Sequence, residues 1–133
     1  MIRPIALAAL VLFAAACVSS GASGGVAPLD EAVEGVCRAT DLARGGDVAG
    51  ASGVFQDRSH EYLHVLADDL MDVDRAAAAR LLEAKQRVEA AFGDPGSADP
   101  EGTAALLSDL QSALAGAATA AGLDPSSCGE DAA

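Results

Sequence analysis

Residues 60–64 carry the side chains with the clearest chemical potential in this sequence. They read His60-Glu61-Tyr62-Leu63-His64, and the sequence contains no other histidine. On a helix, side chains four residues apart lie one turn apart on the same face, so both imidazoles can reach one metal ion. Imidazole nitrogen is a good ligand for zinc and copper, and a glutamate beside such a metal can activate a bound water.

The residues around the histidines indicate what else such a site would contain. Stepping about 100° per residue along one continuous helix places His60 and His64 opposite the apolar side marked by Phe55. Asp57 and Asp68 fall beside the histidines on this polar side. We therefore expect both histidines to face solvent, where Asp57 or Asp68 can complete a metal site.

The same five residues match the H-E-x-x-H signature, and in this respect the chain resembles zinc metallopeptidases. The resemblance implies zinc ligands at His60 and His64 and a catalytic role for Glu61. Those enzymes generally add a third ligand and a substrate-binding strand. Here no strand is indicated, and Glu83 or Glu89 can be that ligand only if their helix turns toward the histidines.

The first 17 residues have the organisation of an export signal. Arg3 precedes an apolar run from Ile5 to Ala16, and small residues lead into Cys17. The run of about 12 residues is shorter than the roughly 20 needed to span a bilayer, which predicts a signal segment at residues 1–16. The ending Ala14-Ala-Ala-Cys17 resembles the lipobox of bacterial lipoproteins, which most often have Leu at the position of Ala14. The resemblance implies that Cys17 becomes the first mature residue and carries lipid; an ordinary cleaved signal is the alternative.

Composition separates the mature part into a tether and one domain. Residues 17–27 are rich in Gly and Ser and predict a flexible tether from the lipidated Cys17, followed by a folded domain at residues 28–133. All 20 acidic residues lie beyond Cys17, against 8 basic residues in the whole chain. Nucleic acid and anionic lipid headgroups need clustered Lys and Arg, so neither is an expected partner of the protein surface. We expect membrane attachment through the lipid, with another envelope protein as a candidate partner.

The three cysteines also fit lipidation. If Cys17 carries lipid, Cys37 and Cys128 remain as a pair, and export supplies an oxidising environment. A disulfide between them closes a loop of about 90 residues and is predicted to stabilise by about 4–5 kcal/mol in the chain-entropy model. Two unpaired thiols are the alternative.

Apolar periodicity and capping residues predict four helices. They extend from Pro28 to Gly45, from Asp47 to about Asp72, from Arg75 to Phe92, and from Pro100 to Gly122. The expected N-caps are Asp47 and Asp99, and Asp72 or Asp74 is expected to allow the break before the helix that starts at Arg75. Short connections between amphipathic helices predict an all-α fold, a small antiparallel four-helix bundle. In this order the first and last helices are neighbours, which brings Cys128 toward Cys37.

Two of these helices carry expectations about burial. The predicted apolar stripe of the second helix consists of Val48, Ala51, Phe55, Tyr62, Leu66, Leu70 and Val73. In the third helix Arg80, Lys85 and Arg87 are interspersed with acidic residues. This pattern predicts a solvated face with ion pairs between residues one turn apart.

Three functions remain open on these residues. The leading expectation is a lipid-anchored extracytoplasmic helical binding or accessory module, with no catalytic residue and no cofactor. The alternative is an envelope protein that binds zinc or copper through His60 and His64. A minimal zinc peptidase that uses Glu61 is the third.

Overall fold

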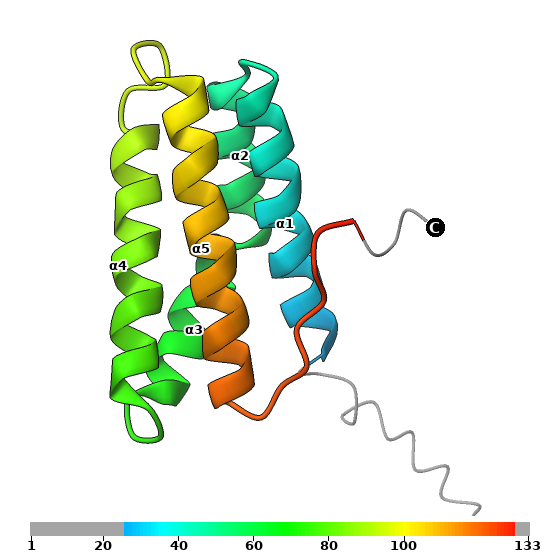
Figure 1. Ribbon diagram of the computed structural model, residues 1–133, viewed down its shortest axis with the longest axis vertical. Helices are drawn as coiled ribbons and strands as arrows, with labels where there is room; N and C mark the ends of the chain where they lie inside the picture. Colours follow the sequence, from blue (N-terminus) through cyan, green and yellow to red (C-terminus); the bar gives the residue numbers. More distant parts are fainter. Residues whose placement is uncertain (1–25, 130–133) are drawn as a thin grey trace, which may run out of the picture.

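The computed structural model describes residues 26–129, which form helices and no strand (Figure 1). The helices are α1 (Val26–Arg44), α2 (Val48–Arg58), α3 (His60–Leu70), α4 (Arg75–Phe92) and α5 (Pro100–Ala120). The predicted all-α class is confirmed. The predicted signal segment, Cys17 and most of the predicted tether lie outside the described residues. Within the described residues, no helix is both long enough and apolar enough to cross a bilayer.

The described residues contain five helices where four were predicted, because the expected second helix is divided at Ser59. The backbone of Ser59 lies at φ −116° and ψ −39°, and its side chain does not cap α3. Instead, the Ser59 hydroxyl donates a hydrogen bond of 2.8 Å to the carbonyl of Ala32 in α1. Helical hydrogen bonding continues around the break, from Ser59 N–H to Phe55 O and from Leu63 N–H to Ser59 O. The break is therefore a kink fixed by a contact with another helix.

Gly35 allows α1 to approach this kink closely. A Cβ atom at Gly35 would lie 2.3 Å from Ser59 Oγ and 2.8 Å from Arg58 Cβ. Such distances are shorter than non-bonded atoms tolerate, so any larger residue would push α1 away from the end of α2. Gly35, Ala32 and Ser59 together join α1 to the α2–α3 junction.

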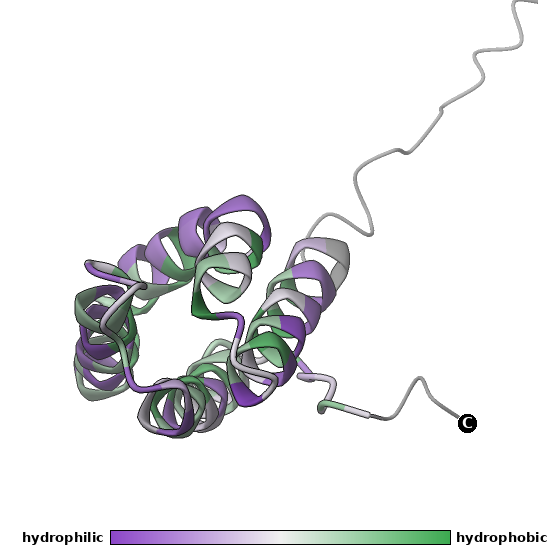
Figure 2. Ribbon diagram, turned by 90° about the horizontal axis from the view of Figure 1, so that it is seen from above, coloured by the Kyte–Doolittle hydropathy of each residue, from purple (hydrophilic) through white to green (hydrophobic). Residues whose placement is uncertain are grey.

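The kink sends α2 and α3 to different neighbours. α1 packs mainly on α2 and α5, whereas α3 packs mainly on α4 and touches α1 much less. Seen from above, the apolar sides of the helices face the interior (Figure 2). One core of Leu, Val and Ala residues joins all five helices, and the rings of Phe55 and Phe92 meet in it with centroids 5.6 Å apart.

The predicted N-caps Asp47 and Asp99 are confirmed, and of the two alternatives Asp72 and Asp74 it is Asp74 that caps α4. Each carboxylate accepts a hydrogen bond from the amide three residues later, at 2.8, 2.9 and 2.9 Å respectively. Such a bond satisfies an amide that has no partner within the helix and stabilises by about 1 kcal/mol. Gly122, with φ +76°, ends the last helical region as expected.

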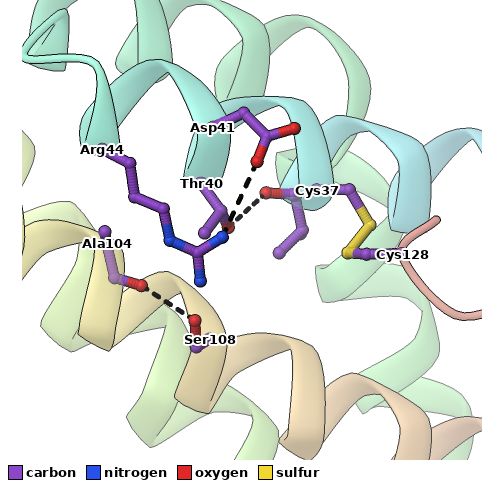
Figure 3. Close-up of polar contacts among 8 residues, drawn as sticks. Cys37, Thr40, Asp41, Arg44, Ala104, Ser108 and Cys128 are labelled. Atoms are coloured by element: carbon purple, nitrogen blue, oxygen red, sulfur yellow. Dashed lines mark hydrogen bonds and ion pairs between the residues drawn. A yellow bond between two sulfur atoms is a disulfide. The ribbon is translucent and has the colours of Figure 1, made fainter.

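The predicted disulfide between Cys37 and Cys128 is present, with a Cα–Cα distance of 5.5 Å (Figure 3). It joins the segment after α5 to α1, and Figure 1 shows this segment running beside α1. Ser126 adds a hydrogen bond of 3.2 Å to Asp30 in α1. The disulfide therefore fixes the position of residues 121–129 beside the first helix.

Candidate functional sites on the two flanks of α3

His60 and His64 lie on α3, with their ring centroids 4.9 Å apart. His60 Nε2 lies 2.9 Å from Glu89 Oε1 of α4, and the His60 ring forms a T-shaped pair with the buried Phe55 ring at a centroid distance of 6.1 Å. The His60 side chain is 29% exposed and lies against α4, so the expectation that it faces solvent holds only in part. That expectation assumed one straight helix, whereas the kink at Ser59 turns α3 toward α4. His64 is exposed, as predicted.

Lys85 joins His60 at the same carboxylate. Its Nζ lies 2.6 Å from Glu89 Oε1, and its side chain is only 4% exposed. The prediction of a solvated face is therefore wrong for Lys85, because its side chain is buried on the inner side of α4. It holds for the exposed pair formed by Arg87 and Glu83. A single oxygen of Glu89 thus receives one polar contact from α3 and one from α4.

The remaining residues of the predicted metal site do not gather around the histidines. Within residues 26–129, no group of three or more His, Cys, Asp or Glu side chains is placed to hold a metal ion. Asp57 and Asp68 are both exposed. Glu89 does reach His60, but the Lys85 ammonium at the same oxygen would repel a metal cation.

On its other flank, α3 borders a groove with a volume of about 680 Å³. The groove lies between the start of α1, the α2–α3 junction, α3 and the residues that follow α5. Its apolar lining consists of Pro28, Tyr62, Val65, Leu66, Leu70, Val73, Ala121 and Leu123. Its charged lining consists of Glu31, Asp57, Arg58, Glu61 and Asp69. Neither histidine lines the groove, so Glu61 and the histidines border different parts of the surface.

The kink at Ser59 explains why this groove is open. α2 packs closely on α1, but beyond Ser59 the chain turns toward α4 and leaves the α1 side of α3 partly uncovered. Val65 is 47% exposed and Val73 is 71% exposed, although both are large apolar residues. Val73 was predicted to be buried; it is exposed because α3 ends at Leu70, and Val73 belongs to the turn that follows.

The groove carries an excess of negative charge. Four carboxylates line it beside one cation, Arg58, whose Nη1 atom is paired with Glu34 Oε1 at 2.8 Å. The pKa of Tyr62 is raised above its ordinary value of 10.0 by burial and, to a smaller extent, by the charges of Asp69 and Asp30. Burial and the two carboxylate charges all disfavour the tyrosinate anion. The effects of Asp69 and Asp30 reflect negative potential around Tyr62.

The groove and the polar cluster at Glu89 have only indirect signs in the sequence. Val65 and Val73 are valines on a polar stretch, but only the divergence of α3 from α1 makes them the lining of a groove. The chain matches no protein-family model, no curated protein and no solved structure. The function is therefore inferred from the groove and from the polar cluster at Glu89.

Proposed function

We propose that this protein is a lipid-anchored extracytoplasmic binding module and that the groove between α1 and α3 is its binding site. The observation that carries the proposal is the groove itself, whose volume lies in the usual range of ligand sites. Partly exposed valines in its lining can release water on binding, which is the main favourable term for apolar ligands.

The position of the groove fits attachment through Cys17. Pro28, which lines the groove, is close in sequence to the predicted lipid site and follows the predicted tether directly. We infer that α2 and α3 form one bent arm of an antiparallel bundle, which presents the groove near the tethered end. Radioactive palmitate should label the wild-type protein in cells and should not label Cys17→Ser. Equal labelling of the two would contradict lipidation at Cys17.

An uncharged apolar naphthylamine dye tests the groove without involving charge. The dye should fluoresce on binding to the Cys17→Ser protein, and Val65→Asp should abolish this signal. Met71→Asp is the matched control, because Met71 is 41% exposed, similar to Val65 at 47%, and does not line the groove. Absence of dye binding, or equal loss in both variants, would contradict the proposed site.

A zinc or copper site at His60 and His64 is the second candidate, favoured by the 4.9 Å separation of the two rings. Glu89 would be its carboxylate ligand, and binding would have to displace Lys85 from that oxygen. Metal titration of the protein and of a His60→Ala/His64→Ala variant tests it. Negligible binding by both would eliminate this candidate.

A further inference from the structure

The charges around the groove indicate which kind of ligand it accepts. We propose that the groove binds a cationic amphipathic helix of a partner protein, with Lys or Arg residues flanking a stripe of apolar side chains. This inference rests on the proposed function, since it names the ligand class of the same groove.

The apolar lining follows α3 at helical spacing. Tyr62, Val65, Leu66 and Val73 line the groove along one side of α3 and the turn after it, while the start of α1 forms the facing wall. Two helices that diverge in this way leave a linear apolar surface. A third helix can lay its apolar stripe into such a surface, which is a common mode of peptide recognition.

The carboxylates extend beyond the groove in one direction. A second hollow, lined by Asp30, Glu34 and the segment around Cys128, shares Glu31 and Arg58 with the groove. Negative side chains therefore continue along α1 past the apolar lining. A ligand that uses both hollows must be elongated and must carry several positive charges, which favours a helix over a small amphiphile.

The same charges argue against two other occupants. An anionic membrane surface would be repelled by the carboxylates around the apolar lining. A second copy of this chain would present the same acidic surface, and its formal net charge is −12. A cationic helix has the complementary charge.

The fluorescence of a single tyrosine can report binding in the groove. Tyr62 lines the groove and is the single tyrosine of the sequence, which has no tryptophan. A designed amphipathic peptide without Tyr or Trp, carrying Lys on its polar face, should therefore change the tyrosine fluorescence of the Cys17→Ser protein. An identical peptide with Glu in place of Lys, and a Lys peptide with its apolar residues scrambled around the helix, should bind far more weakly.

Paired variants separate local recognition from general attraction to an acidic protein. Glu61→Gln/Asp69→Asn removes two charges from the groove, and Asp68→Asn/Asp109→Asn removes two exposed charges elsewhere. Affinity for the Lys peptide should fall about tenfold in the first pair and less than about twofold in the second.

Several results would overturn the inference. Equal losses in the two pairs, or equal binding of the Lys and Glu peptides, would show that the groove does not select a cationic helix. Binding to anionic vesicles that is lost in Val65→Asp and kept in Met71→Asp would assign the groove to a membrane. A dimer in sedimentation that responds to the two variants in the same way would assign the groove to a second copy. Dye binding without peptide binding would overturn the ligand class and leave the proposed groove intact. Absence of both would overturn the proposed function itself.

Discussion

On the α4 flank of α3, His60 and Lys85 both contact one carboxylate oxygen of Glu89, and the ring of Phe55 packs against the His60 ring. On the α1 flank, Glu61 and Asp69 line a groove together with exposed valines. The polar groups of the first flank satisfy one another and hold two helices together. Those of the second leave unbalanced negative charge beside apolar surface. The histidine motif in the sequence predicts a site that would lie on the α4 flank, but the flank without histidines has the properties of a binding surface.

Removal of the disulfide should have the largest effect on stability. Its effect on ligand binding should be confined to the groove flank. Cys37→Ser/Cys128→Ser should lower the free energy of unfolding by about 4 kcal/mol, because the disulfide spans 91 residues of sequence. The segment with Ala121 and Leu123, which lines the groove, should also loosen, so that dye affinity falls. Urea denaturation and dye titration measure the two effects. An unchanged urea midpoint would contradict the prediction.

Two ion pairs of α4 should differ strongly in their contribution to stability. Glu89→Gln leaves the buried Lys85 ammonium without its carboxylate and should lower the free energy of unfolding by about 2 kcal/mol. Glu83→Gln breaks an exposed pair with Arg87 and should lower the free energy of unfolding by less than about 0.5 kcal/mol. Urea denaturation compares the two variants.

Replacement of the buried ammonium provides the control for this comparison. Lys85→Met in the Glu89→Gln background should recover most of the lost stability, because it removes the unpaired buried charge. Equal small losses in Glu89→Gln and Glu83→Gln would show that the α4 flank is not held by its polar cluster.

The kink that separates the flanks depends on the absence of a side chain at Gly35. Gly35→Ala should lower stability by about 1–2 kcal/mol, since its Cβ would clash with Ser59 and Arg58. Gly53→Ala is the matched control: it lies in α2 with no atom within 4 Å of an added Cβ and should stabilise by about 0.5–1 kcal/mol. Thermal unfolding measures both variants. Stabilisation of both would mean that α1 does not need this close approach.

The smallest expected effect is on the titration of Tyr62. Asp69→Asn should lower the pKa of Tyr62 toward its ordinary value of 10.0, because one of the charges that raise it is removed. Asp68→Asn should leave it unchanged, and ultraviolet absorbance of tyrosinate measures both.

The raised pKa of Tyr62 also has a consequence for stability. The folded-state pKa lies above the unfolded value, so the unfolded state releases the proton first as pH rises. The contribution of Tyr62 to stability is therefore present below pH 10.0 and is lost as pH rises through the folded-state pKa.

Local features were predictable from the sequence because their causes are local. Each N-cap, at Asp47, Asp74 and Asp99, bonds an amide only three residues later. The apolar period identified the helical stretches. The cysteine pair was predictable because helical order brings the two chain ends of the domain together.

The break at Ser59 was not predictable, because its cause is distant in sequence. The hydroxyl of Ser59 bonds to Ala32, 27 residues earlier, and Gly35 permits the approach. A periodic pattern contains no sign of such a contact. The burial of Lys85, the turn of His60 toward Glu89 and the opening of the groove depend on the resulting helix directions. The sequence therefore predicted the helical stretches well and the candidate site poorly.

Chemical-shift mapping by NMR tests the central claim most directly. The isotopically labelled Cys17→Ser protein is titrated with the Lys peptide, and amide shifts are followed on both flanks of α3. We predict large changes at Glu61, Val65, Asp69 and Leu123, with His64, Lys85 and Glu89 nearly unchanged. Changes centred on His64 and Glu89, or spread evenly over the acidic surface, would contradict the assignment of binding to the groove.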